Sequence, residues 1–480
     1  MLLIATGLFL RKYFGPVLPD QVLYHLQQGG MDQSDPRLIS RGLRYFAVVV
    51  VATVLLLLLH RRLPLTGQVL LAVSLVGTTY WSLARAIDSR CVDHDGDYLA
   101  DHYVDPAQVT FTGPAQLPDV LVVFVESLET AHVDGVTFGG SLAPNLAEWR
   151  DDHGSYGQML GLGGASWTMG GMFSTLCGVP LQAVGMLQHN AYEYGERFFS
   201  HGTCLPDLLA AQGYEASFYG GASLKFAGKG KFLQAHHVTR RFGADEWRTM
   251  GIDVPTEAWG LPDTQMLAHA WRDMQRPRTL GPQGIERPRL DMVLTVDSHP
   301  PAGITDPGCA PGTDAPITVD ERSPGKVLRH AFQCTDWALH KLLVQWSSRS
   351  DGRDKVILVQ GDHLSMKGSV EPQLVAYAAQ HTRTVYHALA RFDGKGRQLP
   401  PLGLKGNRQF THLDLMPTVL AEAGFSWSDP KGHLALGTAL VSSKGTLLLP
   451  KVHPTLVERD GHAQVDGQLA CQSAKFAAMW

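Results

Sequence analysis

Apolar residues crowd into the first part of the chain, where two long runs contain no charge. One run extends from Tyr45 to Leu59 and the other from Gln68 to Leu83. Each lies near the lower end of the ~17–25 residues that cross a bilayer, and flanking residues lengthen both. The pattern therefore predicts transmembrane helices within residues 1–87, with a pair of buried core helices as the alternative.

Basic residues around these runs give conflicting indications of orientation. The positive-inside rule assigns His60, Arg61 and Arg62, which lie between the runs, to the cytoplasm and the remaining chain to the periplasm. Met1–Leu10 is also apolar but too short to span, and it can be interpreted as the end of an earlier span that starts upstream. Five basic residues before the first run oppose the orientation: Arg11, Lys12, Arg37, Arg41 and Arg44.

Beyond these runs the hydrophobic pattern changes to that of a parallel sheet. Residues 88–117 are polar and predict a linker, and their acidic stretch lacks the downstream Glu of an EF-hand. Three continuous apolar segments follow: DVLVVFVES from Asp119, LDMVLTVDSH around Val293 and DKVILVQGDH around Ile357. Such runs are typical of strands that are buried on both faces.

Predicted helical stretches lie between these strands: CLPDLLAAQGY from Cys204 and VLRHAFQCTDWALHKLLVQW from Val327, the second of which has apolar residues at helical spacing. The alternation of strands and helices predicts a three-layer α/β domain with a mostly parallel central sheet over residues 118–425. Short apolar pieces separated by Gly, Ser and charged residues follow it. They predict a small β-rich appendage over residues 426–480.

All three predicted strands end in polar residues, most of them ionisable. Parallel strands end at one edge of a sheet, where ligands gather, so these side chains should converge. Carboxylates combined with an imidazole suit a divalent metal that handles phosphate. Glu126, Asp362 and His363 supply that set, provided that the third strand has ended in a turn before His363. The strand-end residues are Glu126, Ser127, Asp297, Ser298, His299, Asp362 and His363.

A glycine-rich segment, GLGGASWTMGGMFSTLCGVPL, supplies two candidate nucleophiles, Ser166 and Thr168. A helix that begins at Thr168 directs free backbone N–H groups and a positive dipole end at an anion. A hydroxyl at that position is activated by coordination to a metal. The local sequence is equally compatible with Thr168 as a simple helix N-cap.

Composition and charge restrict the function further. The 480 residues are 44% apolar, which is enough for a sizeable core, and the net charge of -4 argues against a nucleic-acid partner. The six cysteines show neither CxxC nor CxH spacing, which disfavours a cysteine-based zinc site. Disulfides are expected only if the domain is exported.

Five ordered motifs carry a resemblance to a known family: VVFVESLE, ASWTMGGMFSTLCGVPL, YGGASLKFAGKGKFLQAHH, TVDSHPP and GDHLSM. They resemble the sulfatase-like branch of the alkaline-phosphatase superfamily, and most closely the phosphoglycerol transferase I family, which modifies osmoregulated periplasmic glucans. The lipoteichoic acid synthases are more distant relatives. The resemblance extends from Pro118 to Phe425 and implies an alkaline-phosphatase-like form of the α/β fold.

The resemblance also implies roles for individual residues. Glu126, Thr168, Asp362 and His363 are expected to bind one divalent metal ion, Mn²⁺ in the first place and Mg²⁺ or Zn²⁺ as alternatives. Thr168 is expected to be the nucleophile.

Three more residues are expected near the substrate. Lys225, in SLKFAGK, corresponds to a basic residue near the glycerophosphate, and His299, in DSHPP, to a substrate-side histidine. A solvated surface lysine and a structural histidine before a Pro-Pro turn are the alternatives. Trp167 either packs against glycerol or fills the core.

Similar cysteines in the family imply two disulfides, Cys177–Cys204 and Cys309–Cys334, which fit an oxidising periplasm. Cys91 and Cys471 are left unassigned.

The implied activity is transfer of phosphoglycerol from phosphatidylglycerol to a periplasmic glycan, with osmoregulated periplasmic glucan as the first candidate. The reaction would pass through a threonine-linked intermediate and release diacylglycerol. The protein would be a multi-pass protein of the bacterial cell inner membrane, with its catalytic domain in the periplasm. Alternatives are a phosphoethanolamine or phosphoglycerol transferase that acts on lipopolysaccharide or capsule, and a non-catalytic lipid-binding membrane protein.

Overall fold

The computed structural model describes most of the chain, and Met1–Leu10, Cys91 and Cys471 lie outside the described residues. The described residues are 36–86, 102–162, 164–181, 198–255, 259–299, 303–309, 324–365, 372–400, 402, 408–444, 456–459 and 462–465.

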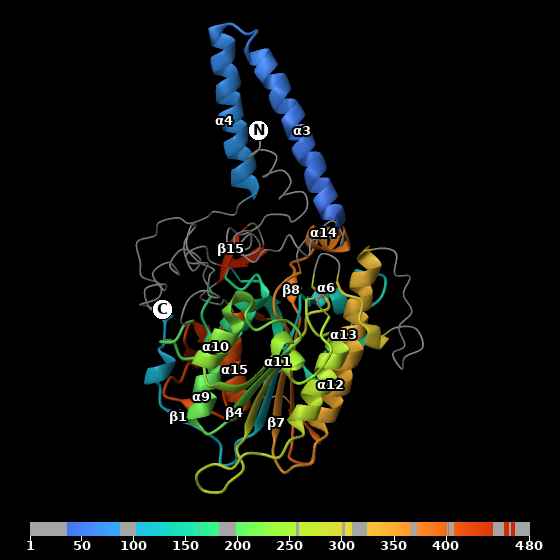
Figure 1. Cartoon of the computed structure of the whole chain (residues 1–480). Helices are drawn as coiled ribbons and strands as arrows, with labels where there is room; N and C mark the ends of the chain where they lie inside the picture. Colours follow the sequence, from blue (N-terminus) through green and yellow to red (C-terminus); the bar gives the residue numbers. More distant parts are fainter. Residues whose placement is uncertain are drawn as a thin grey trace.

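A seven-stranded sheet forms the centre of the α/β domain, with strand order β10-β9-β7-β2-β6-β4-β5 (Figure 1). Its five parallel strands are β2 (Asp119–Val125), β4 (Glu215–Gly220), β5 (Val238–Phe242), β6 (Arg289–Leu294) and β7 (Lys355–Gly361). An antiparallel edge beside β7 is formed by β9 (His387–Phe392) and β10 (Gln398–Leu399). The three strands expected from the sequence are β2, β6 and β7, so the mostly parallel sheet is confirmed.

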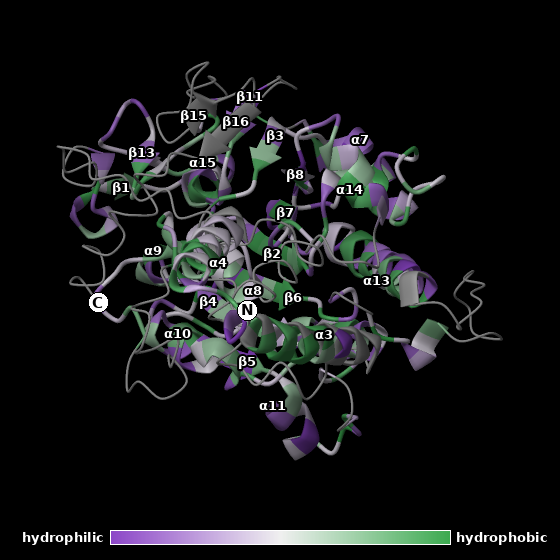
Figure 2. Ribbon diagram, turned by 90° about the horizontal axis from the view of Figure 1, so that it is seen from above, coloured by the Kyte–Doolittle hydropathy of each residue, from purple (hydrophilic) through white to green (hydrophobic). Residues whose placement is uncertain are grey.

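Helices cover both faces of this sheet because its central strands are apolar on both sides. Every residue of β2, β6 and β7 is buried, and Figure 2 shows these strands in hydrophobic colours between the helices. Alternate residues of β2 enter two separate hydrophobic clusters, one on each face. The first cluster includes residues of α8 (Thr168–Cys177), α9 (Leu205–Ala211), α10 (Lys229–Ala235) and α15 (Leu415–Glu422). The second includes residues of α7 (Pro144–His153), α11 (Ala244–Thr249), α12 (Asp263–Met274) and α13 (Pro324–Ser347). The predicted three layers are therefore confirmed.

Two more helices, α3 (Pro36–His60) and α4 (Leu65–Ala86), contain the two N-terminal apolar runs. They form a hairpin that extends from the α/β domain (Figure 1). Many of their apolar side chains are exposed, among them Phe46, Leu70 and Val76. Within the described residues, no helix has both the length and the hydropathy that a membrane crossing requires.

Smaller elements surround the central sheet. A three-stranded sheet consists of β3 (Gly157–Leu160), β8 (Thr384–Val385) and β11 (Arg408–Phe410). Two-stranded sheets are formed by β1 (Phe111–Thr112) with β12 (Ser426–Trp427), by β13 (His433–Leu434) with β14 (Gly437–Thr438), and by β15 (Leu456–Arg459) with β16 (His462–Val465). Short helices are η1 (Pro106–Gln108), α6 (Thr130–Val133), η3 (Phe226–Gly228), η4 (Pro307–Cys309), α14 (Pro372–Ala378) and η5 (His412–Asp414). Leu434 and Val441 are buried in the first hydrophobic cluster, so this C-terminal segment shares the core of the α/β domain.

Candidate active site

Three potential metal ligands meet at the carboxyl ends of two neighbouring strands. Glu126 follows β2, while Asp362 and His363 follow β7, which pairs with β2 in parallel. His363 Nε2 lies 3.4 Å from Glu126 Oε1 and 3.6 Å from Asp362 Oδ2. All three side chains are buried, and their ligand atoms are close enough to share one ion.

The backbone breaks immediately after both strands, which lets adjacent residues face the same site. Ser127 has a φ of 55°, a left-handed conformation that is unusual for a residue other than glycine. Its backbone N–H donates to Asp362 Oδ1 over 2.8 Å, and its hydroxyl donates to Glu126 Oε1 over 2.6 Å. A Cβ on Gly361 would lie only 1.9 Å from the Leu128 carbonyl oxygen, so the approach of the two strand ends requires glycine there.

The fourth predicted ligand, Thr168, reaches the same point from α8. Trp167 is the N-cap residue of this helix and Thr168 is its first residue, so the interpretation of Thr168 as a simple N-cap does not hold. The Thr168 hydroxyl donates a 3.0 Å hydrogen bond to Glu126 Oε2. Gly171, one turn further on, brings the helix backbone against Asp362, since a Cβ there would lie 1.7 Å from the Asp362 carbonyl oxygen.

Burial and mutual charge give the cluster unusual protonation equilibria. Burial disfavours ionised Glu126, but the charge of His299 and the hydrogen bond and charge of His363 outweigh it and hold the Glu126 pKa well below its ordinary value. Burial and the charge of Glu126 raise the pKa of Asp362 to about 8. Burial opposes protonation of His363, but the charge of Asp362 and the contacts with Glu126 raise its pKa to about 9. Glu126 is thus ionised, whereas Asp362 and His363 both hold a proton more tightly than usual, so the site favours positive charge beside its carboxylates.

A divalent cation fits this donor set. Asp362 Oδ2 is buried and makes no hydrogen bond within the described part of the chain, although a buried carboxylate oxygen normally has a partner. Two carboxylates, an imidazole nitrogen and a hydroxyl are the ligands that hard or borderline divalent ions accept. The residues present therefore match the metal site that the sequence indicates.

Contacts around the cluster hold the metal-ligand loop in position. The Nε2 of His412 donates to the Asp362 carbonyl oxygen over 2.8 Å, and burial lowers the pKa of His412 to about 4, so its imidazole is neutral. Arg383 forms a two-pronged ion pair with buried Glu129, and Glu129 Oε1 accepts from the backbone N–H of Ser365 over 3.0 Å. Sequence reasoning missed these residues, because residues 129 and 383 are too far apart in the chain for a local signal.

Lys229 is a second residue that the sequence reasoning missed. Its side chain is only 2% exposed, and its burial lowers its pKa to about 8 against the opposing charges of Glu126 and Asp362. Lys225, the lysine predicted from the motif, has a side chain that is 77% exposed and lies 3.3 Å from Asp245. Of these two, Lys229 is therefore the lysine whose charge acts on the cluster.

The other predicted substrate residues have different surroundings. His299 is half-buried, and its charge acts on Glu126. Trp167 is 2% exposed and belongs to the first hydrophobic cluster. Ser166, the other candidate nucleophile, is half-buried two residues before Thr168.

Both predicted disulfides are confirmed. Cys177, the last residue of α8, is bonded to Cys204, and Cys309 is bonded to Cys334. Cys204 also lies 3.8 Å from His236 Nε2, and these two residues form a second group of metal-ligand type with Asp207. Because the Cys204 sulfur is already in a disulfide, that group lacks the thiolate that a metal would need.

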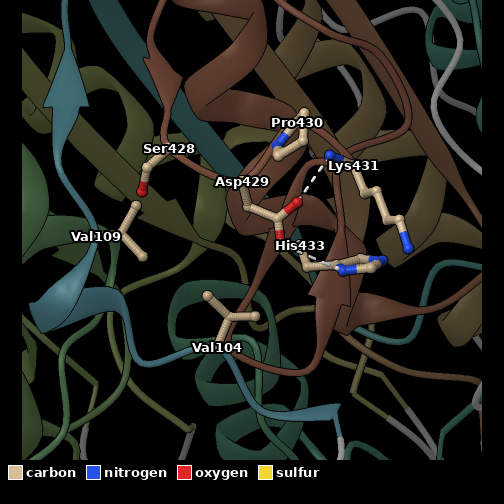
Figure 3. A pocket seen from close by; sticks show the side chains of 7 residues that line it. All are labelled: Val104, Val109, Ser428, Asp429, Pro430, Lys431 and His433. Carbon is tan, nitrogen blue, oxygen red and sulfur yellow. Dashed lines mark hydrogen bonds and ion pairs between the residues drawn. The ribbon is translucent and has the colours of Figure 1, made fainter.

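A separate pocket of about 460 Å³ lies between the segment before β1 and the loop after β12 (Figure 3). Val104 and Val109 line one side, and Asp429, Lys431 and His433 line the other. Asp429 accepts from the Lys431 backbone N–H and lies 3.4 Å from His433 Nδ1, so the Asp429 carboxylate has partners on both of these residues. None of the residues of the metal-ligand cluster lines this pocket.

Comparison with known proteins agrees with this geometry. The sequence profile of the family described as Sulfatase matches residues 118–425. The chain belongs to the sulfatase family. Phosphoglycerol transferase I of Xanthomonas campestris pv. campestris (strain B100) is 31% identical over 260 residues, which are 53% of this chain and 35% of that protein.

A second relative and one crystal structure extend the comparison. Phosphoglycerol transferase I of Salmonella paratyphi B (strain ATCC BAA-1250 / SPB7) is 28% identical over 374 residues, 75% of this chain and 47% of that protein. The chain thus spans less than half the length of these two relatives. A protein in the alkaline phosphatase superfamily from Vibrio parahaemolyticus shares the fold, with a TM-score of 0.51 and 17% identity over 78% of this chain and 91% of that one. The resemblance inferred from the motifs is therefore confirmed.

Proposed function

We propose that the chain is a metal-dependent phosphoglycerol transferase, which moves the head group of phosphatidylglycerol to a periplasmic glycan. The observation that carries the proposal is the hydrogen bond from the Thr168 hydroxyl to Glu126, beside Asp362 and His363. A nucleophile in contact with a metal-ligand cluster at a helix start suits attack on a phosphodiester. The relatives named phosphoglycerol transferase I support the choice of head group.

The reaction consists of two displacements at phosphorus. In the first, Thr168 Oγ1 forms a bond to phosphorus, the bond from phosphorus to the diacylglycerol oxygen breaks, and the proton lost by the threonine balances the one that diacylglycerol gains. In the second, a glycan hydroxyl attacks the glycerophospho-threonine and Thr168 recovers its hydroxyl. A divalent metal, when bound, supplies positive charge against the phosphoryl oxygens.

Residues beside the cluster have complementary roles in this proposal. Lys229 provides a buried cation for the phosphoryl oxygens, as an ammonium in a low-dielectric site stabilises developing negative charge strongly. His299, whose charge already acts on Glu126, is suited to hold or donate a proton at the leaving oxygen. Lys225 and Trp167 stay predictions as substrate contacts, and their exposure and burial favour roles outside the phosphoryl position.

The proposal includes a position at the outer face of the bacterial inner membrane. The uncharged apolar runs in α3 and α4, with exposed side chains such as Phe46 and Leu70, support contact with the bilayer that holds the lipid donor. Two disulfides support an oxidising compartment for the catalytic domain.

The test is a donor-cleavage assay on the full chain in liposomes, with head-group-labelled phosphatidylglycerol and Mn²⁺. Wild type should release diacylglycerol and carry label on the protein, EDTA should stop release, and Mn²⁺ should restore it. Thr168→Ala should lower release by at least about 10³-fold, because the nucleophile is lost, while Thr168→Ser retains part of it.

Other outcomes of this assay select another function. Turnover of phosphatidylethanolamine with no turnover of phosphatidylglycerol identifies a phosphoethanolamine transferase. No turnover of either lipid by the metal-loaded wild type refutes catalysis and leaves a lipid-binding role.

A further inference from the structure

The segment from the loop after β4 to the first residue of α10 presents two lysines to two different environments. Lys229 is almost fully buried and acts on the metal-ligand cluster, whereas Lys225, four residues earlier, is largely exposed. Left-handed conformations at Ala227 (φ 54°) and Gly228 (φ 68°) turn the chain between them. This segment therefore has an inner side, where Lys229 acts on the metal-ligand cluster, and an outer side, where Lys225 is exposed to solvent.

Two aromatic residues, Phe226 and Trp259, connect this outer side with His299 through ring contacts. The Trp259 ring centroid is 4.5 Å from the His299 ring at an interplanar angle of 33°, and 5.9 Å from Phe226 at 80°. Trp259 is half-buried, so the residue is partly accessible to solvent. This aromatic surface is next to a predicted substrate residue.

The backbone around Trp259 is held firmly against the end of β4. Leu261 N–H donates to the Gly221 carbonyl oxygen over 3.0 Å, and Gly260 pairs with Ala222 in an isolated bridge. A Cβ on Gly260 would lie 2.0 Å from the Gly221 oxygen, so only glycine permits this approach. Trp259 is therefore fixed beside His299 in the folded protein.

An ion-pair group lies on segments that neighbour this surface. Lys225 directly precedes Phe226, and Asp245 follows Ala244, whose N–H donates to the carbonyl oxygen of Ala222, the residue that pairs with Gly260. Lys225 Nζ lies 3.3 Å from Asp245 Oδ2, and Arg248 lies 3.0 Å from the other Asp245 oxygen. The side chains of Lys225, Asp245 and Arg248 are 77%, 43% and 41% exposed, so their remaining donors and acceptors face solvent. An aromatic face beside such groups matches a pyranose ring, which has an apolar C–H face and polar hydroxyls at its edge. An acyl chain would gain nothing from the ion pair.

We infer that Trp259 and Phe226, together with the Lys225–Asp245 pair, form the acceptor subsite and bind a sugar ring of the glycan. This inference rests on the proposed transferase function and assigns the acceptor to the outer side of the segment. The acceptor hydroxyl then enters past His299, while Lys229 contacts the phosphoryl group from the inner side.

The test compares two measurements on the full chain in phosphatidylglycerol liposomes with Mn²⁺. One is the KM for a soluble gluco-oligosaccharide as acceptor, and the other is the KM for the lipid with glycerol as a small acceptor. Trp259→Ala should raise the oligosaccharide KM about tenfold and Trp259→Phe less, with a smaller change in the lipid KM. Trp271→Phe, which alters a partly buried tryptophan of α12, is the matched control.

An unchanged oligosaccharide KM in Trp259→Ala overturns the inference, and so does an increase in the lipid KM alone, which would assign Trp259 to the donor. If the wild type cleaves no lipid, the proposed function fails, but the subsite is still tested by binding. Oligosaccharide should change the tryptophan fluorescence of wild type and of Trp271→Phe but not of Trp259→Phe. No change in wild type refutes the subsite.

Discussion

The contact between Gly171 and Asp362 offers a sharp test of how the nucleophile helix and the metal ligands are matched. A Cβ at position 171 would lie 1.7 Å from the Asp362 carbonyl oxygen, and real Cβ contacts are rarely closer than 3.0 Å. Gly171→Ala must therefore move α8 or the Asp362–His363 loop by about 1.3 Å, the difference between 3.0 and 1.7 Å. A misplacement of about 1 Å at a reacting group costs on the order of 10²-fold in rate.

Neither α8 nor the Asp362–His363 loop can move at a low cost in free energy. The atom that blocks the Cβ belongs to the backbone, and the His412 imidazole is hydrogen-bonded to the same carbonyl oxygen. We expect Gly171→Ala to lower diacylglycerol release about 10²-fold, to weaken Mn²⁺ binding about 10-fold or more, and to cost about 1–3 kcal/mol in the free energy of unfolding.

The assay measures release kinetics, Mn²⁺ binding by electron paramagnetic resonance, and urea unfolding of the metal-free protein. Gly77→Ala is the matched control, since a Cβ there meets no atom within 4 Å and the exchange is chemically identical. Gly171→Ala with wild-type Mn²⁺ affinity and wild-type release would refute the claim that this contact sets the position of the metal ligands.

Two further variants test the buried charges. Lys229→Met should lower release about 10²–10³-fold, and it should not lower the free energy of unfolding, because burying a cation costs desolvation energy. Lys229→Arg should retain more activity. Release near the wild-type rate for Lys229→Met would contradict the role of Lys229 as a cation for the phosphoryl oxygens. Asp291 is fully buried, and burial raises its pKa to about 6 from 3.8, so the folded state holds a proton that the unfolded chain loses. The free energy of unfolding of the wild type therefore falls by on the order of 3 kcal/mol through this group as pH rises from about 4 to above 6. An asparagine at this position cannot titrate, so the free energy of unfolding of Asp291→Asn, measured in urea and compared with wild type, should increase by up to that amount between about pH 4 and pH 8. An equal difference at both pH values would show that folding does not raise the pKa of Asp291.

Much of the fold was predictable because its signals are local. Strands β2, β6 and β7 are continuous apolar runs, since both faces of each strand are covered by helices. The runs of β2 and β7 end in the residues that meet in the cluster. After β6, the Ser298 hydroxyl donates to the Glu126 carbonyl oxygen, but Asp297 accepts from the Asp263 backbone N–H instead of joining the cluster. The start of α8 at Thr168 also followed from its local sequence.

The parts that could not be predicted depend on long-range geometry. Lys225 and Lys229 are four residues apart in similar surroundings, and only the left-handed turn at Ala227 and Gly228 decides which one is buried. The Glu129–Arg383 pair joins positions 254 residues apart. The position of Trp259 beside His299 likewise depends on a contact between two loops.

The helix that carries Thr168 is fastened at both ends, by the close contact of Gly171 with Asp362 and by the disulfide at Cys177. A threonine held in this way would, under the proposed function, receive and return the phosphoglycerol group at one point in space. Under the proposed function, the lipid must then vacate the in-line position before the glycan enters it, which gives ping-pong kinetics. Two successive inversions at that point return phosphorus to its original stereochemical configuration.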